Sequence, residues 1–197
     1  ADDLAHQHFS EHSQCLAILG GRLDPERRAQ IVEGLLSDDD LARTTIYFSH
    51  YLFETLRLVG RVDRIFERLE TWFELPALGF RTTREAPEPS RSDCHAWGAH
   101  PIYTSYATVL GLRPGGFGFK TVELCPTFGP LTSIEATLSH PRGEIAVTLD
   151  RDGEAGLHGE IRLPDGVSGF LRYHGRSVAL EAGMQEIDLE MNGGLAS

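Results

Sequence analysis

The first half of the chain repeats apolar residues at the spacing of amphipathic helices. The clearest stripe occupies positions i, i+3, i+4, i+7, i+10 and i+11, and consists of Val62, Ile65, Phe66, Leu69, Trp72 and Phe73. It predicts a helix that ends before Pro76. Similar patterns predict helices over about residues 4–19, 25–36, 45–59 and 103–110, the second with Asp24 as N-cap and Pro25 at the first position. The short links between them favour antiparallel helical hairpins.

Beyond about residue 113 the period of the apolar pattern changes from 3.6 to 2. The alternating apolar positions are Ile145, Val147, Leu149, Ile161, Leu163, Val178, Leu180, Ile187 and Leu189. Turn sequences such as residues 151–153 (Arg-Asp-Gly) and 164–166 (Pro-Asp-Gly) separate these short runs. The pattern predicts an antiparallel β-sandwich over residues 113–197 after a helical domain over residues 1–112, with Gly115-Gly116 as an interdomain hinge.

Composition narrows the class of partner. The 197 residues are 41% hydrophobic and 24% charged, as in a soluble globular protein, and the formal net charge is −11. Such an excess of acids disfavours nucleic acid and anionic membranes as partners, because both require clustered Lys and Arg. No apolar run reaches the roughly 18 residues of a membrane span. The chain opens on Ala1 inside a helix-like segment, so we expect a piece of a longer protein.

The three cysteines, Cys15, Cys94 and Cys125, are far apart in the sequence and form no CxxC pair. They predict reduced thiols and no disulfide framework, and with no segment resembling a signal peptide they favour a cytoplasmic location. His8 and His12 stand four residues apart, but no full HExxH motif accompanies them, so we expect no metal site. The dispersed His100, His140, His158 and His174 are expected at the surface or in turns.

Candidate chemistry gathers in the polar loop over residues 81–101. It contains Glu85, the guanidinium groups of Arg84 and Arg91, the imidazole of His95 and the indole of Trp97. Loops held between rigid helices frequently carry binding and catalytic groups. Taken alone, Glu85 could equally be a solvated loop carboxylate paired with a neighbouring arginine.

Several motifs of the chain together resemble a known family. They are Thr-Thr-Arg-Glu at 82–85, Ser-Arg-Ser-Asp-Cys-His-Ala-Trp at 90–97, Leu-Gly-Leu-Arg-Pro at 110–114, Leu131 and His-Pro-Arg-Gly-Glu-Ile at 140–145. Over about residues 6–190 the sequence resembles the C-terminal part of bacterial α-L-rhamnosidases, which are six-hairpin glycosidases of glycoside hydrolase family 78. The segments around Glu85 and His95 are the most specific.

The resemblance implies an architecture and roles for two residues. Residues 1–112 would be the last hairpins of an (α/α)6 toroid, followed by the C-terminal sandwich. Glu85 would be the general base of an inverting hydrolysis, and His95 would contact the sugar in the −1 subsite. Many members carry a tryptophan directly before the glutamate and a longer loop before the histidine, whereas here Arg84 holds that position and the loop is short.

Inverting hydrolysis of a glycoside needs a protonated acid and an ionised carboxylate on opposite faces of the sugar. The positive charges of Arg84 and Arg91 favour the anionic form of Glu85, which suits the base. The resemblance implies that the general acid lies upstream, in the N-terminal part of the same enzyme, so we expect no turnover by this chain alone. The substrate would be a rhamnose-containing glycoside, and the reaction needs no cofactor.

Further substrate contacts are predicted from residue type. Trp97 offers a flat face for a pyranose, and Arg84, Phe48 and Tyr51 are additional candidates for the subsite walls. Aromatic residues at helical spacing, such as Phe48 and Tyr51, are more often part of a core. Two alternatives stay open, a six-hairpin hydrolase of another sugar and a non-catalytic carbohydrate-binding module.

Overall fold

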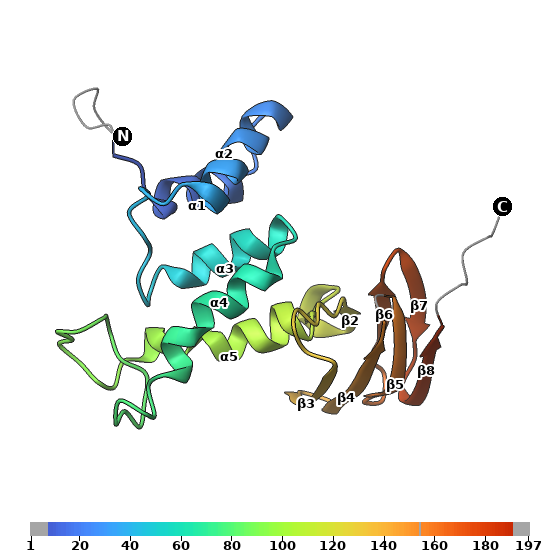
Figure 1. Cartoon of the computed structure of the whole chain (residues 1–197). Helices are drawn as coiled ribbons and strands as arrows, with labels where there is room; N and C mark the ends of the chain where they lie inside the picture. The colour runs from blue at the N-terminus through green and yellow to red at the C-terminus, as the bar shows by residue number, and fades with distance from the viewer. Residues whose placement is uncertain (1–7, 154, 191–197) are drawn as a thin grey trace. The chain divides into compact units, whose positions relative to one another are not determined.

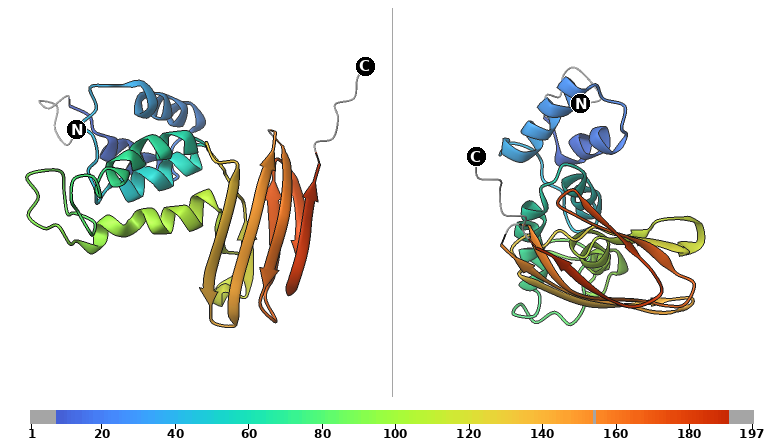
Figure 2. Two further views of the ribbon diagram at one scale, coloured as in Figure 1. Left: turned by 60° about the horizontal axis from the view of Figure 1, so that its bottom comes forward. Right: turned by 90° about the vertical axis from the view of Figure 1, so that its right-hand side faces the viewer.

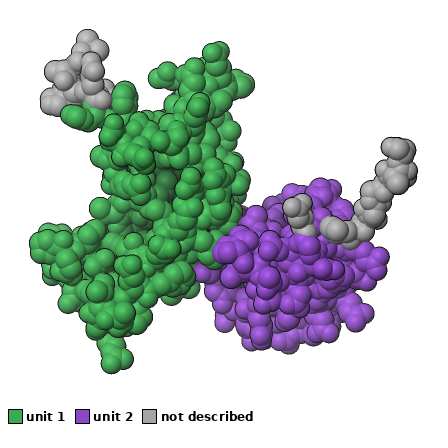
Figure 3. Space-filling model, viewed as in Figure 1, with its two compact units in different colours: residues 1–104 green, residues 105–197 purple. Residues whose placement is uncertain are grey.

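The computed structural model describes residues 8–153 and 155–190. The chain divides into two compact units, residues 1–104 and residues 105–197 (Figure 3, green and purple). This division falls shortly before the boundary at residue 112 that the change of period predicts. Within the described residues, no helix is both long and apolar enough to cross a membrane.

The first unit is built from helices joined by short loops (Figure 1). They are α1 (Glu11–Leu19), α2 (Pro25–Ser37), α3 (Ser49–Leu58), α4 (Val62–Phe73), the 3-10 turn η1 (Ala96–Ala99) and α5 (His100–Thr104). The bounds of α4 match the predicted stripe. Helix α2 starts as predicted, because the Asp24 side chain accepts a hydrogen bond of 2.8 Å from the Arg27 amide. Residues 4–7 of the first predicted helix lie outside the described residues.

Apolar faces of α1 to α4 share one core. Its buried members are Cys15, Ile18, Leu35, Leu52, Phe53, Leu56, Val62, Ile65 and Leu69. Beside this core, Glu11 of α1 lies buried and its Oε1 accepts a hydrogen bond of 2.7 Å from Arg68 of α4. The Glu11 Oε2 also accepts 2.6 Å from the Thr44 amide, so one carboxylate ties together three segments of the helical unit. A complete six-hairpin toroid stays a prediction.

The second unit consists mainly of two four-stranded sheets. Its strands are β1 (Leu112–Pro114), β2 (Thr121–Leu124), β3 (Ser133–His140), β4 (Gly143–Asp152), β5 (Gly156–Leu163), β6 (Ser168–Tyr173), β7 (Arg176–Leu180) and β8 (Gly183–Leu189). One sheet has the order β1-β2-β6-β7 and the other β3-β4-β5-β8, visible in two orientations in Figure 2. The pair β2 and β6 is parallel, so the prediction of a wholly antiparallel sandwich is wrong for that pair.

Alternating residues of the strands supply the interior of this unit. Ile145, Val147 and Leu149 of β4 are buried, as the period of 2 predicts. Opposite register partners continue the pattern, with Val147 facing Ile161 across β4 and β5. The β-sandwich character of the C-terminal half is therefore established by burial as well as by pairing.

The predicted hinge at Gly115-Gly116 is wrong. These glycines open the connection between β1 and β2, which pair with each other, and the Gly115 amide donates 2.8 Å to the Thr121 carbonyl. The segment is thus the end of a hairpin within the second unit. Period alone could not distinguish a hairpin turn from a linker, because both are rich in glycine.

Candidate functional site

The loop that contains the candidate chemistry folds back on itself. The Glu85 amide donates 2.9 Å to the Ser92 carbonyl, and the His95 amide donates 2.8 Å to the Thr83 carbonyl. The Thr83 hydroxyl returns a bond of 2.9 Å to the His95 carbonyl. Residues 82–85 and 92–95 therefore form two hydrogen-bonded arms. The arms fix Glu85 and His95 on the same short scaffold, although ten residues separate them in the sequence.

Helix α4 anchors the base of this scaffold. Trp72, near the end of α4, donates a hydrogen bond of 2.7 Å from Nε1 to the Gly98 carbonyl. Gly98 itself packs so closely that an added Cβ would lie 2.8 Å from the Arg84 carbonyl and 2.9 Å from the Thr83 Cβ. Only glycine fits there, and the close approach holds η1 against the first arm.

Glu85 is buried, with 7% of the residue exposed. Its Oε1 accepts a hydrogen bond from the guanidinium of Arg91, whose side chain is 84% exposed. No described residue donates a hydrogen bond to Oε2. The carboxylate is thus held on one oxygen by a solvent-exposed cation, and the second oxygen has no protein partner within the described part of the chain.

Trp97 connects Glu85 with His95. Its Nε1 donates 3.0 Å to the Glu85 carbonyl, and its ring lies 4.1 Å, centroid to centroid, from the His95 ring. The indole is 41% exposed, so it presents a ring surface to solvent beside the imidazole. An imidazole donor next to an aromatic face is a common means of holding a sugar, because sugar rings have both hydroxyl groups and apolar C–H faces.

The helical hairpin contributes a further aromatic residue that the sequence reasoning did not select. Tyr47 lies 5.2 Å from the Trp97 ring and 6.1 Å from Tyr51, and it is 48% exposed. Phe48 instead packs against the helical core and against His12, at 4.3 Å. Residues 47 and 48 precede α3, outside its regular period, so helical spacing could not tell which of them faces the loop.

Arg84 differs from the other arginines of the described residues because it is buried, with 8% exposed. Its guanidinium carbon lies 5.7 Å from the centroid of the Phe80 ring. Its Nε is buried and has no hydrogen-bond partner among the described residues. Phe80 in turn lines an open depression of about 320 Å³, whose other lining residues are Leu78, Gly79, Arg81, Thr82, Asp93 and Cys94.

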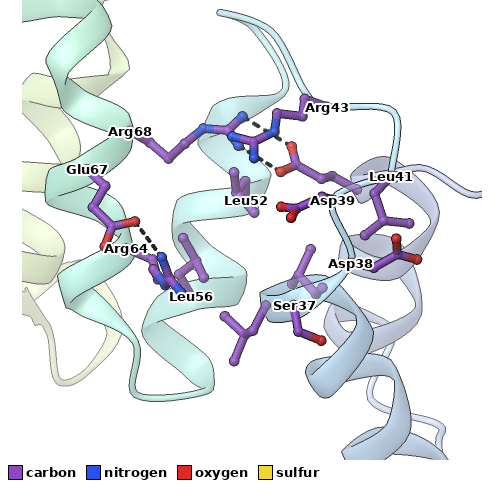
Figure 4. A pocket seen from close by; sticks show the side chains of 13 residues that line it. Ser37, Asp38, Asp39, Leu41, Arg43, Leu52, Leu56, Arg64, Glu67 and Arg68 are labelled. Atoms are coloured by element: carbon purple, nitrogen blue, oxygen red, sulfur yellow. Dashed lines mark hydrogen bonds and ion pairs between the residues drawn. The ribbon is translucent and has the colours of Figure 1, made fainter.

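A second, smaller cavity of about 110 Å³ lies among the helices, away from the candidate loop (Figure 4). Arg64 and Arg68 of α4 border it on one side, and Asp38 and Asp39 lie on the other. None of the predicted site residues lines it. Its guanidinium groups already have acidic partners, since Arg64 pairs with Glu67 and Arg68 with Glu11.

Two histidines expected at the surface are not there. The His140 residue is 8% exposed and its Nε2 lies 2.9 Å from the Phe119 carbonyl. His100 packs between aromatic rings of the helical unit, 5.3 Å from Phe53 and 5.1 Å from Trp72. Burial lowers the pKa of His100 to about 4. Their positions between apolar neighbours could not be inferred from isolated histidines in the sequence.

The described residues contain no group of three or more His, Cys, Asp or Glu side chains arranged to hold a metal ion. All three cysteines have free thiols, with Cys15 buried and Cys94 and Cys125 exposed. Burial raises the pKa of the Cys15 thiol to about 11.

Comparison with known proteins gives a consistent result for both units. Residues 111–180 match the family model of the bacterial alpha-L-rhamnosidase C-terminal domain. The GH78 family rhamnosidase of Bacillus sp. GL1 superposes with a TM-score of 0.77 and 25% identity over 84% of this chain. The α-L-rhamnosidase of Aspergillus terreus superposes with a TM-score of 0.80 and 17% identity over 92%. That of Streptomyces avermitilis, solved in complex with L-rhamnose, gives 0.74 and 17% over 91%.

These comparisons confirm the resemblance to the C-terminal portion of α-L-rhamnosidases that the motifs indicate. A search of the curated proteins gives no match. The chain spans only 19%, 24% and 21% of the lengths of the three solved enzymes, so it corresponds to a small part of each.

Proposed function

From the likeness of this chain to the C-terminal part of α-L-rhamnosidases, we propose that it forms part of a glycoside hydrolase that removes terminal α-L-rhamnosyl groups by inversion. The observation that carries the proposal is the joint position of Glu85, His95 and Trp97 on one hydrogen-bonded loop. Burial of the carboxylate and exposure of the indole suit a reacting group beside a sugar platform.

Glu85 acts as the general base in this proposal. Its Oε2, which no described residue occupies, takes a proton from the attacking water, and that water then bonds to the anomeric carbon as the glycosidic bond breaks. The leaving oxygen takes its proton from a general acid that belongs to the upstream part of the longer enzyme. The proposed ring of six hairpins would bring that acid to the opposite face of the sugar.

Arg91 controls access to the base. It holds Oε1 through a side chain that is 84% exposed, so it can move without disturbing the packed arms of the loop. While in place it stabilises the ionised carboxylate, which is the form a base requires. His95 donates a hydrogen bond to a sugar hydroxyl, and the exposed faces of Trp97 and Tyr47 pack on the pyranose ring.

The test is Glu85→Gln in the full-length enzyme, with an aryl α-L-rhamnoside as substrate. We expect kcat to fall by about 10³-fold or more while the sugar still binds, because the amide cannot accept the proton. NMR of the first product formed should show inverted anomeric configuration. Retained configuration, or near-normal turnover by the variant, would exclude Glu85 as the base.

One observation favours the second candidate function, binding of a glycan without catalysis. The buried pair of Glu85 with Arg91 resembles a structural ion pair, which would leave the carboxylate unavailable for chemistry. Arg91→Ala in the full-length enzyme separates the two functions. A catalytic Glu85 predicts altered turnover with an intact fold, whereas a structural pair predicts lowered stability and no turnover in either protein.

A further inference from the structure

Arg84 carries a positive charge that nothing in the described part of the chain neutralises. It is the arginine with the lowest exposure among those residues, at 8%, and its Nε is buried without a hydrogen-bond acceptor. Burial of a guanidinium group is unfavourable unless an anion or several acceptors compensate it. A folded protein that retains such a group usually uses it.

The neighbouring acids are already engaged. Glu85 gives its Oε1 to Arg91, and Glu88 accepts a hydrogen bond of 3.0 Å from the Ser90 amide. Asp93 lines the depression beside Phe80, but it forms no ion pair with Arg84. The only contact recorded for the Arg84 guanidinium is the face of Phe80, 5.7 Å away, which orients the cation without neutralising it.

The surroundings suit a ligand with an acidic group. Phe80 and Arg81 both line the depression of about 320 Å³, a volume at the lower end of the range for small-molecule sites. Arg81 is exposed and adds a second positive charge. The chain as a whole has a net charge of −11, so this local excess of positive charge runs against the general composition. Arg84 also directly precedes Glu85, the proposed base.

We propose that Arg84, with Arg81, forms a subsite for the carboxylate of a uronic acid that adjoins the rhamnosyl group in the substrate. This inference rests on the proposed function, since it identifies the class of aglycone. The planar guanidinium fork matches a carboxylate better than a hydroxyl, and a buried cation penalises a neutral sugar that leaves it unpaired. The enzyme therefore prefers acidic rhamnosides over neutral ones.

The first test uses the full-length enzyme with two matched disaccharides, rhamnosyl-glucuronic acid and rhamnosyl-glucose. We expect Arg84→Gln to lower kcat/KM for the acidic disaccharide by about thirtyfold and for the neutral one by less than about threefold. Arg84→Lys should restore part of the preference, because it returns the charge without the fork. Arg27→Gln, an exposed arginine on α2, is the control and should alter neither value.

The second test needs no turnover. The protein is titrated with glucuronate, and the NMR signal of the Arg84 Nε–H is followed, with glucose as the neutral control. A shift with glucuronate that glucose does not cause, and that added salt weakens, supports the subsite. Absence of that shift overturns the inference, even if rhamnosidase activity is present.

The outcomes separate this inference from the proposed function. Equal losses on both disaccharides, together with a lower unfolding temperature of Arg84→Gln, would show that Arg84 pairs with a carboxylate elsewhere in the longer enzyme, and would overturn the subsite. Failure of the wild-type enzyme to cleave either disaccharide contradicts the proposed function. The titration then decides the anion site by itself.

Discussion

Replacing Arg68 by methionine should be among the most damaging single changes to the helical unit. The Arg68 guanidinium donates 2.7 Å to Glu11 Oε1 and 3.1 Å to Oε2, and also 3.0 Å to the Thr44 carbonyl. The side chain of Glu11 is 9% exposed and that of Arg68 is 21% exposed. Arg68→Met keeps the apolar stem but leaves a buried carboxylate whose remaining donor is the Thr44 amide.

We expect the free energy of unfolding to fall by about 3 kcal/mol at pH 7, the lower part of the range for breaking a buried pair, because Arg68 is partly exposed. Glu11→Gln in the same background should recover part of the loss, since no buried charge then remains. Arg64→Met, one turn earlier on α4, removes a more exposed pair with Glu67 and should cost less than about 1 kcal/mol.

Urea unfolding followed by tryptophan fluorescence measures these differences, because both tryptophans, Trp72 and Trp97, belong to the helical unit. Burial alone would raise the pKa of Glu11, but the bonds from Arg68 and Thr44 outweigh it and lower the pKa below 4.5. The pair therefore stabilises the fold above about pH 4.5, and its contribution is lost as the pH falls through the lowered value. A loss below about 1 kcal/mol, or strict additivity with Glu11→Gln, would refute the reasoning.

Three other predictions concern the loop, a histidine and the thiols. Gly98→Ala should destabilise the helical unit by about 1–3 kcal/mol in the same assay, because its Cβ meets the Arg84 carbonyl at 2.8 Å, whereas Gly34→Ala in α2, with nothing within 4 Å, should be neutral or stabilising. For His100, the unfolded chain takes up a proton near pH 6.5 and the folded chain only near pH 4, so stability should fall by up to about 3 kcal/mol between those values. His100→Gln should lack this fall; an unchanged pH profile would contradict the assignment. Ellman's reagent should modify Cys94 and Cys125 in the native protein and Cys15 only after unfolding, and rapid reaction of all three thiols would argue against the burial of Cys15.

The parts of the fold that the sequence predicts well are those in which a local signal and the tertiary structure agree. The stripe of α4 gives its bounds because one face is packed and the other is solvated. Strand β4 is recovered for the same reason. Strand β6 was missed, since its alternation places Gly169 inside and Phe170 outside, which reverses the usual apolar pattern. The parallel pairing of β2 with β6 depends on residues far apart in the chain and has no local signal.

The candidate site shows the same division. The motifs around Glu85 and His95 identified the loop, and the structure adds the hydrogen bonds that join its two arms. The part played by Tyr47 depends on a contact with Trp97, 50 residues later, which no spacing rule reveals. The isolation of the Arg84 charge is equally invisible in a sequence that places arginine beside glutamate, because adjacent residues of an extended segment point to opposite sides.

The hydrogen bonds that join residues 82–85 to residues 92–95 separate the tip of the loop from its stem. Positions 86–91 lie outside this clasp, so changes of length or sequence there leave the spacing between the carboxylate and the imidazole unaltered. The tip can therefore diversify while the paired stem stays constant. A protein built this way can acquire a new preference for its leaving group by exchanging six residues, without rebuilding the machinery beneath them.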